Sequence, residues 1–502
     1  MKVLFLYPNL PLMMVIPTAI TSMSAHLKER GVEVDLFDTT FYKIMEKSAD
    51  EMRVEICQNK PFKFSDADVG YKTTDMHQDF VNKLEDFKPD VLAISCNDFT
   101  HKIAESLIEN IHDRYPELHI IMGGIYPTFF PEHAIANPDV DSICIGEGYE
   151  ALYELCQIIE KQQGNKVYNI KNLWVKDATY PNNIHKNPMR PPIDINTIPF
   201  DDFDLFEPKR HYRPMFGKML KILPFWFDIG CPYNCTYCSA PQLKRIYKEG
   251  GHKYGRVKNI DRIKEELTYQ INKHKPEFIY FSSETFFARS DEHVKEFAEF
   301  YKQFNIPFWC EARSENITEE NTAILKEMGC SRISIGLESG NEEYRMNILN
   351  KRFTNDQFLR SANILKLNGI KFTTNNIIGL PDETREMVFD TIELNRQITN
   401  WSNDVNQVIS TYVPTGGTDL QKYCLEKGYF NLDEYLNMPY GGFHISIYLN
   451  MPQLPPKDVV GLLRTFPMYV RFDKDRWDEI KLAETDDMVY KNLMVEYWNN
   501  LR

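Results

Sequence analysis

Two stretches in which short apolar runs alternate with helical patterns constrain the fold of this 502-residue chain more than any other feature. In the first stretch, from Lys2 to about Gln163, a helical pattern over 18–30 ends at Gly31, a common helix stop. Such alternation predicts a parallel sheet with helices on both faces and ligand contacts at the carboxyl ends of its strands. The expected strands are 3–7, 32–36, 90–96, 119–122 and 142–145.

The second stretch begins at Phe225 and repeats the alternation six times. Six β/α units are too few for a closed eight-unit barrel, so we expect a partial, open (β/α)6 barrel of the TIM type. Active-site groups should then lie at the carboxyl ends of its strands. The expected strands are 225–229, 278–282, 308–311, 332–337, 372–378 and 407–413.

The remaining segments divide the chain. Residues 165–221 are rich in proline and polar residues, which is typical of a linker with some local structure. The last segment is aromatic-rich without a clear repeat, and we expect a small, mainly helical cap that selects the substrate. The expected units are an α/β domain at 1–164, a linker at 165–221, the barrel at 222–420 and the cap at 421–502.

Composition narrows the class of function. The formal net charge of −14 argues against a large nucleic-acid interface, which needs a basic face. No apolar run approaches the roughly 20 residues that cross a bilayer, and the run at 3–7 is too short for a signal peptide. We therefore expect a cytoplasmic protein with neither a nucleic-acid partner nor a membrane segment.

Three of the ten cysteines form a cluster, whereas seven are scattered. Cys231, Cys235 and Cys238 are spaced C-x3-C-x2-C after the expected first barrel strand. Three thiolates on one loop can hold three irons of a 4Fe–4S cluster, and the fourth iron stays open for an outside ligand. The alternatives are a structural zinc site, which favours four protein ligands, or three unrelated thiols.

The triplet, with Tyr237 before its last cysteine, resembles the signature of the radical S-adenosylmethionine (radical SAM) superfamily. The segments Gly336-Leu337-Glu338-Ser339-Gly340 and Asn376-Ile377-Ile378-Gly379-Leu380-Pro381 are similar to segments of members that carry an N-terminal cobalamin-type domain. The resemblance implies that S-adenosylmethionine binds the open iron and that its reductive cleavage gives a 5′-deoxyadenosyl radical. It also implies an external electron donor such as a flavodoxin or ferredoxin.

The resemblance further implies roles for polar residues at the ends of the barrel strands. Family members often carry paired acids where this chain has Ser282-Ser283, so Glu284 is the substitute candidate. For each position the alternative is a structural polar group, and no catalytic acid or base is assigned. The expected S-adenosylmethionine contacts are Tyr237 at the adenine; Ser282, Ser283 and Glu284 at the amino group; Arg313 at the carboxylate; and Glu338 at the ribose or amino group.

The first domain resembles a flavodoxin-like, Rossmann-type cobalamin-binding domain that lacks the D-x-H-x-x-G motif after its first strand. Loop 8–17 has neither the histidine nor the aspartate of that motif, as in the branch that binds cobalamin without a histidine ligand. The alternatives are a domain without cobalamin and an ordinary apolar loop. The expected cobalamin contacts are Leu10, Leu12 and Met13 at the lower face of the corrin, with Ser95, Gly123, Gly124 and Glu147 at the strand ends.

The resemblance implies a cobalamin-dependent methyl transfer to an unactivated carbon of a small molecule, a peptide or a protein side chain. Cyclisation, rearrangement or oxidation with the same cofactors is an alternative. A non-catalytic cluster- or corrin-binding sensor or scaffold is a third hypothesis. Sulfur insertion into transfer RNA is disfavoured, because those relatives usually add a second cysteine triplet and a basic tail.

Overall fold

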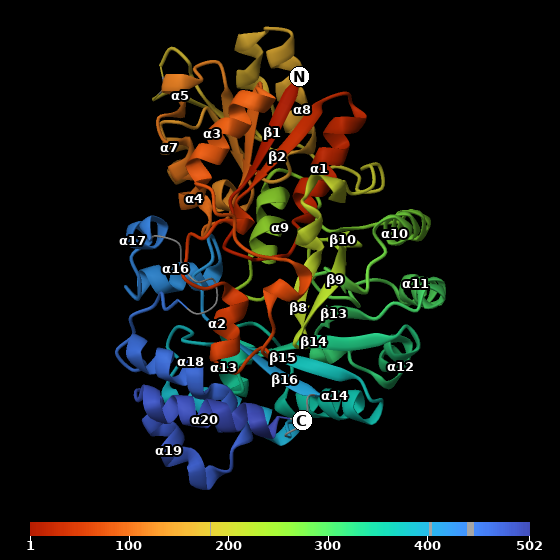
Figure 1. The fold of residues 1–502 in the computed structure, drawn as a ribbon, viewed down its shortest axis with the longest axis vertical. Coiled ribbons are helices and arrows are strands. Elements are labelled where there is room, and N and C mark those ends of the chain that lie inside the picture. The colour runs from red at the N-terminus through yellow and green to blue at the C-terminus, as the bar shows by residue number, and fades with distance from the viewer. Residues whose placement is uncertain (181, 401–403, 439–445, 502) are drawn as a thin grey trace.

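The computed structural model describes residues 1–180, 182–400, 404–438 and 446–501. Its strands form two seven-stranded sheets and one short two-stranded ribbon. Figure 1 shows the first sheet at the N-terminal end of the long axis, the second sheet near the middle, and the last helices at the opposite end.

The first sheet consists of β1 (Lys2–Tyr7), β2 (Glu33–Asp38), β3 (Val91–Ser95), β4 (His119–Gly123), β5 (Ser142–Cys144), β6 (Leu173–Lys176) and β7 (Ile184–Lys186). Its order is β2-β1-β3-β4-β5-β6-β7, and the first five strands are parallel. The order 2-1-3-4-5 is that of flavodoxin, which confirms the expected fold class. The helices of this domain are α1 (Thr18–Glu29), α3 (Met76–Phe87), α4 (His101–Ile108), α5 (Ile111–Arg114), α6 (Ile125–Phe129), α7 (Pro131–Ala136) and α8 (Tyr149–Glu160).

The second sheet consists of β8 (Tyr212–Met215), β9 (Lys218–Phe225), β12 (Phe278–Phe281), β13 (Phe308–Ala312), β14 (Cys330–Glu338), β15 (Lys371–Ile378) and β16 (Val405–Thr411). The strands from β9 to β16 are parallel and follow one another in chain order, and β8 adds an antiparallel edge. This is the expected open (β/α)6 barrel. Its helices are α9 (Ser239–Glu249), α10 (Ile260–His274), α11 (Asp291–Tyr301), α12 (Glu319–Glu327), α13 (Glu342–Asn347), α14 (Asn355–Leu367) and α15 (Arg385–Ile398).

The local structure between the two domains is more extensive than the sequence indicates. The stretch 165–221, expected to be a linker with some local structure, contributes to both sheets, because β6 and β7 extend the first sheet and β8 with the start of β9 belongs to the second. Pro214 fits this arrangement because β8 is an edge strand, where a missing N–H is tolerated. The strand expected at 225–229 ends at Phe225, and Asp228–Ile229 forms a separate ribbon strand, β10, with β11 (Arg256–Val257).

A segment of the first domain closes the open side of the barrel. The helix α2 (Ala49–Glu55) starts with a capping box at Ser48, and Figure 1 shows it beside the second sheet rather than the first. After it, the Gln58 side chain donates to the carbonyl of Ile409 at 3.0 Å and accepts from its N–H at 3.1 Å. One side-chain amide thus satisfies backbone groups on the free edge of β16, which would otherwise be exposed to pairing.

The C-terminal segment contains α16 (Asp419–Glu426), α17 (Leu432–Asn437), α18 (Pro456–Arg471), α19 (Trp477–Ala483) and α20 (Asp487–Asn500). Tyr435 on α17 donates to Asp98 in the loop after β3 at 2.5 Å, so this segment also contacts the first domain. Within the described part of the chain, no helix has both the length and the apolarity needed to span a membrane.

Candidate functional site

The cysteine triplet lies on the loop that leads into α9, with Cys238 directly before the helix. Cys235 is buried, whereas Cys231 and Cys238 are half-buried. Burial, together with the charges of Glu284, Cys235 and Cys231, raises the pKa of Cys238 to about 12. Each of these three groups is thus close enough to act electrostatically on Cys238.

The end of β12 places its polar residues against this loop. Ser283 is buried and donates to Asp228 at 2.9 Å, whereas the Ser282 hydroxyl is directed to the carbonyl of Phe225 at 3.4 Å. The Glu284 side chain reaches solvent, and desolvation by the surrounding protein, with the charge of Asp228, raises its pKa. Of these positions, Glu284 therefore presents a carboxylate to the cysteine loop.

Arg313, after β13, contacts the cysteine loop directly. Its guanidinium donates to the sulfur of Cys235 at 3.4 Å and lies 3.9 Å from the centre of the Tyr233 ring. It also donates to Glu315 at 2.6 Å. The guanidinium is therefore beside the cluster ligands, with one carboxylate partner already in place.

Glu338 ends β14 in the left-handed region, at a φ of 65°. Its carboxylate accepts a hydrogen bond from Lys351 at 2.7 Å. Burial and the nearby Glu338 charge raise the pKa of Tyr237 well above its usual value, so the two side chains face each other. A Cβ atom at Gly336 would collide with both Glu338 and Lys351, so glycine leaves the space that this pair occupies.

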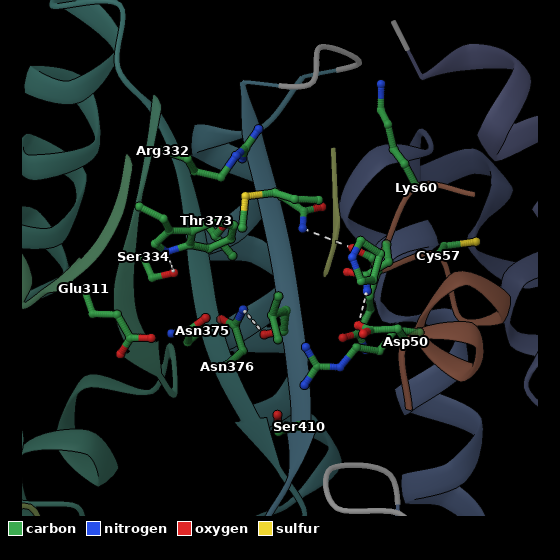
Figure 2. Close-up of a pocket in the computed structure, with 18 of the residues that line it drawn as sticks. Asp50, Cys57, Lys60, Glu311, Arg332, Ser334, Thr373, Asn375, Asn376 and Ser410 are labelled. Carbon is green, nitrogen blue, oxygen red and sulfur yellow. Dashed lines mark hydrogen bonds between the residues drawn. The ribbon is translucent and has the colours of Figure 1, made fainter. Parts of the chain in front are cut away.

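A cavity of about 550 Å³, here called the chamber, occupies the interior of the open barrel. It is lined by Tyr237 from the cysteine loop, by Phe99 from the first domain and by residues along the barrel strands. Figure 2 shows Asp50, Cys57 and Lys60 on one side of the chamber. The opposite side carries Glu311, Ser334 and Asn375.

A smaller pocket of about 50 Å³ lies at the carboxyl ends of the first sheet. It is lined by Ser95, Gly123, Gly124 and Gly146, together with apolar side chains. Ligands of open α/β sheets bind at this edge, and glycine permits a close approach to the backbone. The three predicted strand-end residues Ser95, Gly123 and Gly124 thus share one pocket.

Comparisons with known proteins agree with this architecture. Residues 229–394 match the family model of the radical SAM superfamily, and residues 13–156 match that of the B12 binding domain. The chain belongs to the radical SAM family with an N-terminal cobalamin-binding domain. The matched ranges contain the cysteine triplet and the glycine-lined pocket, respectively.

Individual relatives are distant. An uncharacterized methyltransferase of Pyrococcus horikoshii is 26% identical over 69% of this chain and 72% of its own length. An anaerobic magnesium-protoporphyrin IX monomethyl ester cyclase of Rubrivivax gelatinosus is 26% identical over 66% of this chain and 60% of its own length. The structure of the radical SAM methyltransferase TsrM from Kitasatospora setae is similar with a TM-score of 0.61 at 14% identity, covering 85% of this chain and 76% of that one. This last similarity concerns the fold.

Family membership brings a 4Fe–4S cluster, S-adenosylmethionine and cobalamin, and the residues fit these groups to different degrees. Three thiols on one loop suit a cluster with one open iron, although no three of the described His, Cys, Asp or Glu side chains are gathered as a metal site. Tyr237 and Glu338 line the chamber beside this loop and suit a cosubstrate with a positive amino group and an aromatic base. The glycine-lined pocket suits a cofactor that approaches the backbone closely.

The loop predicted to cover the corrin is packed against protein in this structure. Leu10 and Leu12 are 3% and 2% exposed, in two different apolar clusters, and Met13 is half-buried. Arg210, fully buried, donates to the carbonyls of Met13 at 2.6 Å and Val15 at 3.0 Å. Contact of this loop with the corrin stays a prediction.

Glu147, which is predicted to contact cobalamin, forms contacts with protein groups in this structure. Its carboxylate forms an ion pair with Arg256 of β11 and accepts from the N–H of Ile193 at 3.2 Å. Its own N–H donates to the hydroxyl of Tyr247 on α9 at 2.8 Å. The Gly146–Gly148 loop is therefore tied to the helix that follows the cysteine triplet.

Sequence reasoning missed several residues of this site. Asp228 stands three residues before the first cysteine of the triplet, but its bond to Ser283 follows only from the strand ends meeting in space. No local pattern marks Lys351 or Arg256 as a partner of a predicted carboxylate. The contribution of 49–62 to the chamber was also missed, because this segment was assigned to the first domain alone.

Proposed function

We propose that this enzyme transfers a methyl group to an unactivated carbon of a substrate held in the chamber. The observation that carries the proposal is that one cavity is lined by the cysteine loop, the barrel strands and the first domain together. When bound, the cluster with S-adenosylmethionine supplies a carbon radical and cobalamin supplies the methyl group. The proposal requires that a substrate carbon within this cavity be reached from both cofactor sites.

The chain's own residues bind and orient the cosubstrate in this proposal. Glu284 and Glu338 bind its amino group as carboxylates, and Lys351 holds the carboxylate of Glu338 in place. Tyr237 lies beside the adenine, Ser283 supports Asp228 behind the cluster loop, and Arg313 holds the carboxylate next to Cys235. The burial of Arg313 and Glu338 limits the access of water to this end of the site, where water would quench a radical.

An external protein such as a flavodoxin or ferredoxin is proposed as the electron donor. Cys231 and Cys238 are half-buried, whereas Cys235 is buried, so the loop is accessible from one side. That side is the proposed approach of the donor.

The name of one relative supports a second candidate function. The Rubrivivax gelatinosus protein is named a cyclase, and it matches this chain about as well as the methyltransferase-named relative does. A radical reaction that closes or rearranges a ring without methyl transfer is therefore the alternative for the same site.

The test follows two products of S-adenosylmethionine by mass spectrometry. Anaerobically purified protein with its cluster and cobalamin should release 5′-deoxyadenosine with a strong reductant, and S-adenosylhomocysteine only where a methyl group is transferred. The Cys235→Ala variant should lose deoxyadenosine formation and keep its cobalamin, whereas Cys330→Ala should behave like the wild type. Deoxyadenosine without S-adenosylhomocysteine in the presence of substrate would favour the cyclase alternative. No deoxyadenosine from a fully loaded protein would favour a sensor or scaffold.

A further inference from the structure

Two arginines enter the chamber from different parts of the chain. Arg53 belongs to α2 in the segment that closes the open side of the barrel, and Arg213 belongs to the edge strand β8. Both residues line this one cavity, and burial together with the Arg213 charge lowers the pKa of Arg53. Among the described residues, neither side chain has a carboxylate within ion-pair distance or a hydrogen-bond acceptor.

The surrounding groups do not neutralise this pair. Asp50 is the acidic residue whose charge acts on both arginines, and its carboxylate accepts from Asn59 at 3.0 Å. Arg213 lies 5.3 Å from the centre of the Tyr280 ring. One carboxylate therefore faces two guanidiniums, and Lys60 adds a further positive charge to the same lining.

A second acid in the chamber, Glu311, is engaged by another partner. Tyr280 donates to Glu311 at 3.3 Å, and burial with the nearby Glu284 charge raises the pKa of Glu311 to about 7. Among the described residues, Glu311 forms no ion pair with either arginine. The local excess of positive charge favours an anion.

We propose that Arg53 and Arg213 bind an anionic oxygen group, a carboxylate or a phosphate, on a small-molecule substrate of this enzyme. The assignment as a substrate site rests on the proposed function, since it uses the same chamber. A planar guanidinium makes paired hydrogen bonds to two oxygens of such a group, and two guanidiniums can share one. Small ligands occupy cavities of roughly 300–1,000 Å³, and the chamber has about 550 Å³.

The position of the arginines determines the distance between the anionic group of the substrate and its reacting carbon. Arg213 stacks near Tyr280, and Glu311 pairs in register with Ser334 of β14. Glu338, at the cosubstrate end, lies four residues further along the same strand, which is roughly 13 Å at the rise of a β-strand. The reacting carbon should therefore lie on the order of 10 Å from the anionic group.

The experiment measures anion binding by titration calorimetry on the full-length protein loaded with its cluster and cobalamin. The probes are inorganic phosphate and glutarate, which distinguish a phosphate from a carboxylate. We expect one probe to bind, with about tenfold weaker affinity in Arg53→Gln and in Arg213→Gln, in line with the loss of a charge-assisted pair. The matched control Arg360→Gln, an exposed arginine on α14, should bind like the wild type.

Two further variants separate binding from folding. Arg53→Lys keeps the charge without the planar pair of donors and should restore part of the affinity. Asp50→Asn keeps the shape and the contact to Asn59 while removing the competing carboxylate, so it should bind the probe more tightly. A variant that merely fails to fold would not bind the probe more tightly than the wild type does.

The outcomes of the two proposals differ. If the wild type makes deoxyadenosine but binds neither probe, or if Arg53→Gln and Arg213→Gln bind as tightly as the wild type, the anion site is refuted and the proposed function stands. If the wild type binds a probe in an Arg53-dependent way but makes no deoxyadenosine, the anion site stands and the radical function fails.

Discussion

The placement of Glu338 depends on the absence of a side chain two residues earlier. Gly336 faces the carboxylate and the Lys351 ammonium, so a methyl group there would displace the pair. Because Glu338 is proposed to bind the amino group of S-adenosylmethionine, this displacement should be seen in cosubstrate affinity. Such a defect would leave the cysteine loop itself intact.

We therefore predict that Gly336→Ala weakens S-adenosylmethionine binding about tenfold, the loss expected for one charge-assisted hydrogen bond. Equilibrium dialysis on the reconstituted protein would measure the affinity, and iron content should stay at the wild-type level. Gly70→Ala is a suitable control, because a Cβ there meets no other atom within 4 Å. Unchanged binding in Gly336→Ala would argue against the role of Glu338.

Glu383 is a fully buried carboxyl in the turn after β15. It accepts from the N–H groups of Gly379 at 2.6 Å and Leu380 at 3.2 Å, and burial raises its pKa from 4.5 to about 8 despite these bonds. Between pH 4.5 and about pH 8, Glu383 is thus protonated in the folded state and ionised in the unfolded state. The free energy of unfolding should fall as pH rises through the window from about 4.5 to 8.

Glu383→Gln removes this ionisation while its amide oxygen still accepts from the two N–H groups. A carboxyl whose pKa rises from 4.5 to about 8 on folding loses roughly 3–4 kcal/mol of stabilisation between pH 5 and pH 8. We therefore expect the decrease in melting temperature over this range to shrink by about 10 °C, at about 2–4 °C per kcal/mol for a domain of about 200 residues. Scanning calorimetry at both pH values measures it, with the exposed Glu426→Gln as control. A larger pH dependence in Glu383→Gln would contradict the assigned pKa.

At the scale of elements, the edge of β16 is protected by a side chain rather than by another strand. Gln58 is 2% exposed, and its amide satisfies both the N–H and the carbonyl of Ile409. The nearby Asn406 side chain donates to the carbonyl of Gln58 at 3.1 Å. This contact also holds α2, and with it Arg53, against the barrel.

Gln58→Ala should lower the free energy of unfolding by about 2–6 kcal/mol, because two buried backbone groups lose their partners at about 1–3 kcal/mol each. Urea unfolding followed by circular dichroism would measure the loss. Gln303→Ala, an exposed glutamine on the same barrel, should change stability by no more than about 0.5 kcal/mol. Equal stabilities for the two variants would show that the edge of β16 does not depend on Gln58.

At the scale of the whole molecule, the first domain contacts the barrel and the C-terminal segment at several places. Glu147 pairs with Arg256, Asp98 accepts from Tyr435, and Gln58 lies along β16. Gly416 adds close packing, since a Cβ there would collide with Phe129 and Phe130. These contacts connect the domain that carries the glycine-lined pocket to the one that carries the cysteine loop.

Glu147→Gln tests the first of these contacts. Both partners are 16% exposed, so we expect a loss of about 2 kcal/mol, below the 3–5 kcal/mol of a fully buried pair. Hydrogen exchange should rise in the ribbon strands β10 and β11, whereas bound cobalamin per chain should be unchanged. Loss of cobalamin without faster exchange would instead support direct contact between Glu147 and the cofactor.

The sequence by itself determined the features that depend on local order. The cysteine spacing predicts the cluster loop because three ligands of one cluster must lie on a short stretch of chain, and period-2 and period-3.6 patterns predict both α/β domains. Short strands such as β6 and β8 were not predicted, because proline and polar residues in and around them obscure the alternation of apolar and polar residues. Tertiary structure alone decided that Arg256 pairs with Glu147, that 49–62 closes the barrel, and that Arg53 meets Arg213. These contacts join residues far apart in the chain. A local periodicity in the sequence does not indicate which distant side chain will lie next to a given charged group.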